Sequence, residues 1–95
     1  MKLIKFSKSS RKGKKYMMVF ETKTIHFGSD VSQTFVEGAS EKKRANYIAR
    51  HKVREDFSKI NPASLSRYIL WGNSSNLQTN LKDYIKRFKI TDNRK

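Results

Sequence analysis

The hydrophobic pattern of this 95-residue chain changes its period near residue 39, and this change constrains the fold more than any other feature. Before it, short runs of strand-forming residues are separated by turn formers, and residues 24–27 alternate between the two faces of a strand. After it, apolar residues recur at the three- and four-residue spacing of helices. We therefore predict a single α+β domain over residues 1–95, with a small antiparallel sheet of three to four strands followed by three helices packed on one face.

Turn and capping residues set the expected bounds of each element. Ser40 and Asn61 are suited to cap helices, Pro62 suits a first helical turn, and Gly72 suits a left-handed helix end. The sheet is expected at about residues 2–36, with strands at residues 3–6, 16–22, 23–28 and, as a short edge strand, 34–36. The helices are expected at about residues 40–55, 62–71 and 75–89.

Large apolar residues are scarce, so most of them are needed in the core. Leu, Ile, Val and Phe supply 22 of 95 residues, little more than a highly charged disordered chain would have. The first helix is expected to turn Ala45, Ile48, Ala49 and Val53 inward, at the spacing of one helical face. The other predicted core residues are Phe20, Phe27, Phe57, Leu65, Ile69, Trp71, Leu81 and Phe88.

The formal net charge of +14 indicates a polyanionic partner, most often nucleic acid. Without cysteine, the chain has no disulfide scaffold, zinc ribbon or thiol nucleophile. No apolar run approaches the length of a membrane span, and the first residues do not form a secretory signal, so we expect no membrane association. The pattern also contains no phosphate-cradling glycine loop, and we expect no cofactor, metal or small-molecule substrate.

Three groups of cations are candidates for contacting phosphates. One lies in a flexible basic loop at about residues 7–15, and the other two lie on the backs of the first and last helices, opposite their apolar faces. The candidate nucleic-acid-binding residues are Lys8, Arg11, Lys12, Lys14 and Lys15 in the loop, Lys43, Tyr47, Arg50 and Arg54 on the first helix, and Lys82, Lys86 and Lys89 on the last.

The residues support catalysis and sequence-specific recognition less strongly than they support phosphate binding. His51, Glu55 and Asp56 could form a magnesium-dependent nuclease site, but ion pairing within the helix explains them more simply, and we expect no enzyme. His26, between apolar residues of a strand, is expected to be packed and hydrogen-bonded. The second and third helices match a helix-turn-helix in spacing only, because few side chains there could read base edges.

Four segments follow one another in an order that carries a family resemblance. A His-Phe-Gly triplet at residues 26–28 precedes an Arg-His-Lys-x-Arg-Glu-x-aromatic segment at residues 50–57. A Leu-Ser-x-aromatic-Ile-Leu-Trp helix at residues 65–71 and a Tyr-x-Lys-Arg-Phe end at residues 84–88 follow. Over residues 14–88 the chain resembles a family of small basic proteins encoded by large nucleocytoplasmic DNA viruses, of the algal-virus and giant-virus type. The resemblance implies a virus-encoded protein packaged in the particle, and it implies no settled activity.

Charge and resemblance together lead to one expected function and one alternative. We expect a non-enzymatic viral protein that binds nucleic acid, DNA rather than RNA, through phosphate contacts during genome packaging or condensation. Such a protein would occur in the virion and in the host cytoplasm or nucleus during infection. The alternative is a minor structural protein that cements acidic capsid surfaces. Arg67, alone in an apolar helix, is hypothesised to be the buried partner of Glu55 or Asp56.

Overall fold

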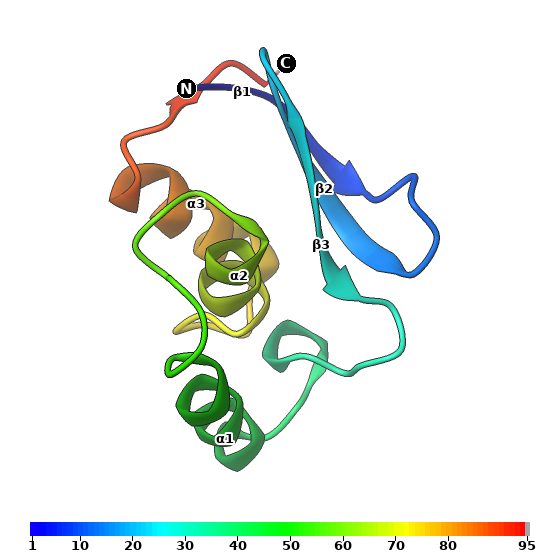
Figure 1. Cartoon of the computed structure of the whole chain (residues 1–95), viewed down its shortest axis with the longest axis vertical. Coiled ribbons are helices and arrows are strands. Elements are labelled where there is room, and N and C mark those ends of the chain that lie inside the picture. The colour runs from blue at the N-terminus through cyan, green and yellow to red at the C-terminus, as the bar shows by residue number, and fades with distance from the viewer. Residues whose placement is uncertain (95) are drawn as a thin grey trace.

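The computed structural model describes residues 1–94 and has the predicted α+β fold, with helices on one side of a four-stranded sheet (Figure 1). The strands lie in the order β3-β2-β1-β4. They are β1 (Lys2–Lys8), β2 (Lys14–Phe20), β3 (Thr24–Ser29) and β4 (Thr91–Asp92). The helical elements are η1 (Phe35–Glu37), α1 (Glu41–His51), α2 (Pro62–Leu65), η2 (Ser66–Leu70) and α3 (Leu77–Arg87).

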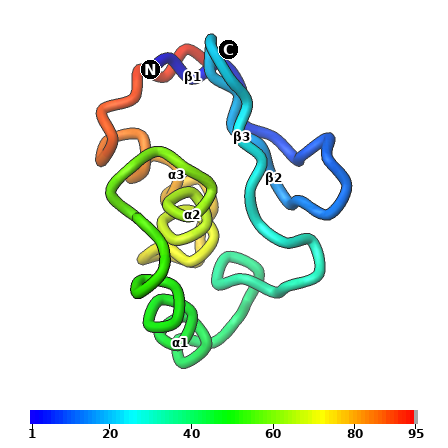
Figure 2. The backbone as a smooth tube through the Cα atoms, in the orientation of Figure 1, coloured from blue at the N-terminus to red at the C-terminus, as the bar shows by residue number. Residues whose placement is uncertain are grey.

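The fourth strand corrects the expectation of a purely antiparallel sheet. The pairs β1–β2 and β2–β3 are antiparallel, but β4 comes from the C-terminal residues and runs parallel to β1. The main-chain N–H of Thr91 donates to the carbonyl oxygen of Met1 at 3.0 Å, and that of Asn93 donates to Leu3 at 2.8 Å. Figure 2 shows the first and last strands side by side, so one edge of the sheet is formed by a contact between the first and last elements of the chain.

The expected edge strand at residues 34–36 is wrong, because this segment forms the 3₁₀ turn η1. The main-chain N–H and the hydroxyl of Thr34 both donate to Oε1 of Glu37, at 3.0 and 2.8 Å. This Thr-x-x-Glu pattern is the signature of a capped helical start, and it outweighs the strand propensity of Phe35 and Val36.

The core lies between the inner face of the sheet and the helices. The sheet contributes buried Leu3, Met18 and Ile25 as well as the predicted residues Phe20 and Phe27. From the helical half the predicted residues Leu65, Ile69, Trp71 and Leu81 are buried, together with Leu70, Tyr84 and Ile90.

Two predicted core residues lie at the margin of the core instead. Phe57 and Phe88 are half-buried, and each lies against Tyr68 with ring centroids 6.3 Å apart. Tyr68 is itself half-buried, so these three rings form a shell outside the core rather than a part of it.

The helix caps follow the sequence, but the end of the second helix does not. Ser40 and Asn61 accept hydrogen bonds from Lys43 N–H and Ser64 N–H, at 3.2 and 2.8 Å, as predicted. Beyond α2 the chain continues as the π-helical turn η2 and ends without a left-handed glycine. Gly72 is required for a different reason: a Cβ atom there would lie 2.3 Å from the main-chain oxygen of Tyr68.

A buried asparagine fixes the turn between η2 and α3. Asn80 is 1% exposed, and its Nδ2 donates to the carbonyl oxygens of Ile69 and Ser74, at 2.9 and 2.6 Å. Its Oδ1 accepts from the main-chain N–H of Ser74 at 3.2 Å. One side chain therefore satisfies three main-chain groups of the turn.

Candidate nucleic-acid interface

Helix α1 turns a different face toward the body of the protein than its apolar residues predict. Ala45 and Ala49, expected inside, are exposed. Val53 is 76% exposed, because α1 ends at His51 and Val53 follows in a turn. The half-buried residues of α1 are Arg44, Tyr47, Ile48 and His51. Long polar and aromatic side chains reach the body where alanine methyl groups would not.

Arg44 attaches α1 to the end of η2. Its Nε donates to the carbonyl oxygens of Trp71 and Gly72, at 3.3 and 2.7 Å, and its Nη2 donates to Oδ1 of Asn73 at 2.7 Å. From η2 itself, Nη1 of Arg67 donates to the same Trp71 oxygen at 3.1 Å. Two guanidinium groups thus satisfy carbonyl groups that the end of a helix leaves free, where the helix dipole is negative.

The hypothesis that Arg67 is the buried partner of Glu55 or Asp56 is therefore wrong. Glu55 pairs with His51, and Asp56 is exposed. Burial lowers the pKa of Arg67 below its ordinary value, and the main-chain bond to Trp71 provides the polar contact that its half-buried guanidinium needs.

Tyr47, predicted to lie on the basic back of α1, packs against the body of the protein. Its ring stacks on Trp71 with centroids 4.6 Å apart and on His51 with centroids 4.2 Å apart. Burial, with the nearby charge of Glu55 as the second cause, raises the pKa of Tyr47 to about 12. Because two rings cannot stack on the same face at these distances, both faces of Tyr47 are covered and neither is free for a nucleobase.

A cleft of about 900 Å³ is lined by residues of α1, of the sheet, and of α2 and η2. Three exposed cations line it, namely Lys14 from the start of β2 and Lys43 and Arg50 from α1. The fold therefore brings part of the loop group and part of the first-helix group to one concave surface, although they are far apart in the sequence.

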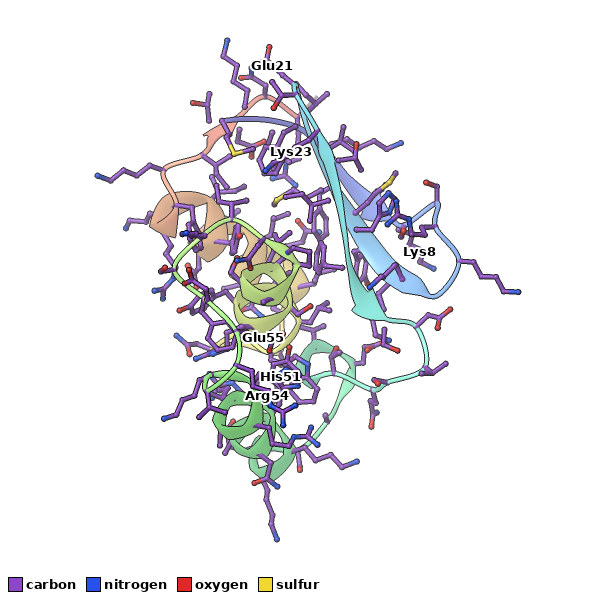
Figure 3. All side chains as sticks on the ribbon, viewed as in Figure 1. Lys8, Glu21, Lys23, His51, Arg54 and Glu55 are labelled. Carbon is purple, nitrogen blue, oxygen red and sulfur yellow. The ribbon has the colours of Figure 1, made fainter. Side chains whose placement is uncertain are left out.

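The carboxylate that lines the cleft is already paired. Glu55 contacts Nδ1 of His51, four residues earlier, in the local ion pairing that the sequence predicts for this segment. Figure 3 shows His51, Arg54 and Glu55 together at the end of α1. The side chain of Glu55 is thus engaged by its own helix, and the three cleft cations outnumber this single carboxylate.

The loop residues differ in their availability to a partner. Lys8, Arg11, Lys12 and Lys14 are exposed around the β1–β2 turn. The side chain of Lys15, in contrast, is 9% exposed, and its Nζ lies 3.0 Å from Oε1 of Glu37. The first four are free to contact a phosphate, whereas Lys15 joins β2 to η1.

His26 occupies the position predicted for it. It is half-buried on β3, and its Nδ1 lies 2.6 Å from Oγ of Ser9, at the start of the basic loop. On the same strand Ile25 and Phe27 point into the core, as the alternation predicts. The contact to Ser9 ties the loop to the sheet.

The remaining candidate cations lie outside the cleft. Arg54 is exposed just after α1. Lys82 and Lys86 are exposed on α3 and Lys89 just after it, and no residue of α3 within the described chain lines the cleft. In Figure 1 α3 and α1 lie at different ends of the helical half, so the third group forms a separate surface.

Clusters of metal-ligating side chains and long apolar helices are two further features for which the described residues can be compared. Within residues 1–94 no group of three or more His, Cys, Asp or Glu side chains is arranged to hold a metal ion. In the same part of the chain, no helix has the length and apolar character that crossing a bilayer requires.

Several residues that build this region gave no functional signal in the sequence. Asn46, Gln33 and Ser66 line the cleft, and Arg44 sets the position of α1. Arg44 follows two lysines in a run of cations and looks like one more solvated charge. Only the position of η2, set by tertiary packing, shows which of these cations faces the protein.

The chain belongs to a family of unknown function (DUF5754), whose family profile matches residues 4–51. The matched segment runs from β1 to the end of α1 and contains all three cleft cations, whereas α3 lies outside it. No curated protein and no solved structure matches the chain.

Proposed function

We propose that this member of the family binds nucleic acid, preferentially duplex DNA, through phosphate contacts and without base recognition. The observation that carries the proposal is the convergence of Lys14, Lys43 and Arg50 on one cleft whose acid is already paired. Lys12 and Arg54 are also exposed and lie within four residues of Lys14 and Arg50 in the sequence. A surface of this kind gains affinity by releasing the counterions condensed on the phosphates.

The size of the protein suits binding along a backbone. Its longest dimension is 35 Å, which corresponds to about ten base pairs at roughly 3.4 Å per pair. Tyr47 has no free ring face, so stacking on bases does not contribute at this position. The described interface therefore supports electrostatic binding of the backbone rather than readout of a sequence.

The test is the affinity for a labelled duplex, measured by fluorescence anisotropy over a range of salt concentrations. Replacing Lys43, Arg50 and Arg54 by Gln should reduce the slope of log affinity against log salt by about 2 to 3, since each phosphate contact contributes roughly 0.9. The matched control replaces three exposed cations that do not line the cleft, Lys2 and Lys5 on β1 and Lys23 in the turn between β2 and β3, and removes the same charge.

The two variants separate a binding surface from a general effect of charge. The proposal expects a much smaller change of slope in the control than in the α1 variant. Equal changes in both, or a slope near zero for the native protein, would contradict it. The proposal is one of binding without catalysis. Magnesium-dependent nicking of the duplex by the native protein, absent in the His51→Ala variant, would contradict it.

The resemblance to small basic viral proteins supports a narrower form of the proposal, in which the bound DNA is a viral genome during packaging or condensation. Fractionation of disrupted particles tests it: the protein should leave with the genome core. Ordered density beneath the capsid shell would instead favour the alternative role as a capsid cement.

A further inference from the structure

We propose that the cleft beside α1 takes a single nucleotide unit, with its phosphate held by Lys14, Lys43 and Arg50 and its base against α2 and η2. This inference rests on the proposed function and adds a defined ligand site to it. The same chemistry is offered by a free nucleotide and by one residue of a single strand or strand end.

The walls of the cleft differ in chemistry according to the element that supplies them. The cations come from α1 and from the start of β2, together with the polar side chains of Ser29, Gln33 and Asn46. The wall from α2 and η2 supplies no cation, and it is largely apolar, with Pro62, Ala63, Leu70 and Trp71. An anionic group with an apolar, flat body attached would match both kinds of wall.

The charge balance of the cleft selects an anion. Three cations line it, and Glu55 is held by His51. Lysine and arginine side chains carry hydrogen-bond donors but no acceptors. A phosphate group matches them because its several oxygens can accept hydrogen bonds from all three side chains. A neutral ligand would leave the excess positive charge of these exposed cations uncompensated.

The volume of the cleft selects a small unit of nucleic acid rather than a duplex. About 900 Å³ lies at the upper end of the range for small-ligand sites. A duplex that spans the 35 Å protein is far larger than this volume, so it would lie across the cleft and not within it. The site would thus distinguish an accessible nucleotide from one inside a duplex.

The only tryptophan of the chain reports directly on this cleft. Trp71 lines it and stacks on Tyr47, so a ligand against the apolar wall should change its fluorescence. The probes are deoxyadenosine monophosphate, deoxyadenosine, and a short single strand of deoxyadenosines with and without a 5′ phosphate. Saturable quenching by the monophosphate and much weaker quenching by the nucleoside are expected, because the nucleoside lacks the charged group.

The strand probes identify the source of the nucleotide. Tighter binding of the strand than of the monophosphate shows that the site takes part of a polymer, and a requirement for the 5′ phosphate shows that it takes a strand end. Tighter binding of the monophosphate than of either strand assigns the site to free nucleotides. The absence of a saturable signal with every phosphorylated probe would overturn the inference.

A pair of matched variants tests whether the cleft itself is responsible. Arg50→Gln should weaken binding of the monophosphate at least about tenfold, and Lys42→Gln, an exposed neighbour outside the cleft, should leave it within about twofold. Equal weakening by both variants would overturn the inference. Circular dichroism of each variant confirms that it is folded.

The duplex titration separates this inference from the proposed function. If the native protein does not bind the monophosphate but binds the duplex with the expected salt dependence, only the nucleotide site is refuted. If the native protein binds the monophosphate but not the duplex, the proposed function is refuted and the protein is a nucleotide-binding protein.

Discussion

The guanidinium of Arg44 donates from Nε to the carbonyl oxygen of Gly72 at 2.7 Å, and this bond attaches α1 to the end of η2. Helix α1 has no buried residue, so it is not held by a hydrophobic face. Its position depends on Arg44 and on the stack of Tyr47 with Trp71. The position of α1 beside the cleft therefore depends on one polar contact and one aromatic stack.

Replacing Arg44 by Met should lower the free energy of unfolding by about 2 to 3 kcal/mol, because hydrogen bonds to charged groups are lost from a side chain that is 14% exposed. Urea unfolding followed by circular dichroism measures the effect. Lys42→Met removes the same charge from an exposed position of α1 and should cost less than about 0.5 kcal/mol. Arg44→Lys should recover only part of the loss, because an ammonium group lacks the planar fork that reaches several acceptors. Equal costs for Met at both positions would contradict this role.

Asn80→Ala should destabilise the protein by about 3 kcal/mol, because it leaves main-chain groups of Ile69 and Ser74 without partners in or near the core. Thermal or urea unfolding measures the loss. Gln78→Ala, at an exposed position of the same helix, is the control and should be nearly neutral. A cost below about 1 kcal/mol for Asn80→Ala would show that water replaces the lost bonds.

The pair of Lys15 and Glu37 should make stability depend on acid pH. Burial raises the pKa of Glu37, but hydrogen bonds from Lys15 and Thr34 outweigh it and hold the pKa below its ordinary value. Stability from this carboxylate is therefore fully present above roughly pH 4.3, the ordinary value for glutamate, and is lost as the pH falls through the lower folded value. Because Glu37 is 40% exposed, the loss should stay below about 1 kcal/mol.

Unfolding curves of the native protein and of Glu37→Gln, measured between pH 7 and pH 3, test this dependence. The difference in stability between them should shrink as the pH falls below the ordinary glutamate value. The reverse trend, with the difference growing in acid, would show that the carboxylate is destabilising in the folded state.

Much of the fold could be predicted from local patterns. The alternation of Ile25 and Phe27, the caps at Ser40 and Asn61 and the change from strands to helices after residue 39 are all indicated by short-range features. Each is decided by neighbours in the chain, and the structure bears them out. The parallel pairing of β4 with β1 joins the two ends of the chain, and no local pattern indicates such a contact.

The first helix shows where pattern alone misleads. Its alanines have the spacing of a buried face, yet Arg44 and Tyr47 turn inward. The reason is the element against which α1 packs. The end of η2 presents carbonyl groups, to which Arg44 donates hydrogen bonds, and the ring of Trp71, on which Tyr47 stacks. Alanine methyl groups could make neither contact. For the same reason Tyr47, which was predicted to be an exposed contact to nucleic acid, packs against the body of the protein.

The sequence by itself determined the excess of positive charge and its division into three groups, because charge follows directly from composition and order. Only the tertiary structure decided which cations act together. In the folded chain Lys15 pairs with Glu37, the α3 group lies on a separate surface, and Lys14 lines the same cleft as Lys43 and Arg50. The physical reason is that a shared surface depends on distances between elements, and these are set by the packing of the core and by the bonds of Arg44 to the end of η2.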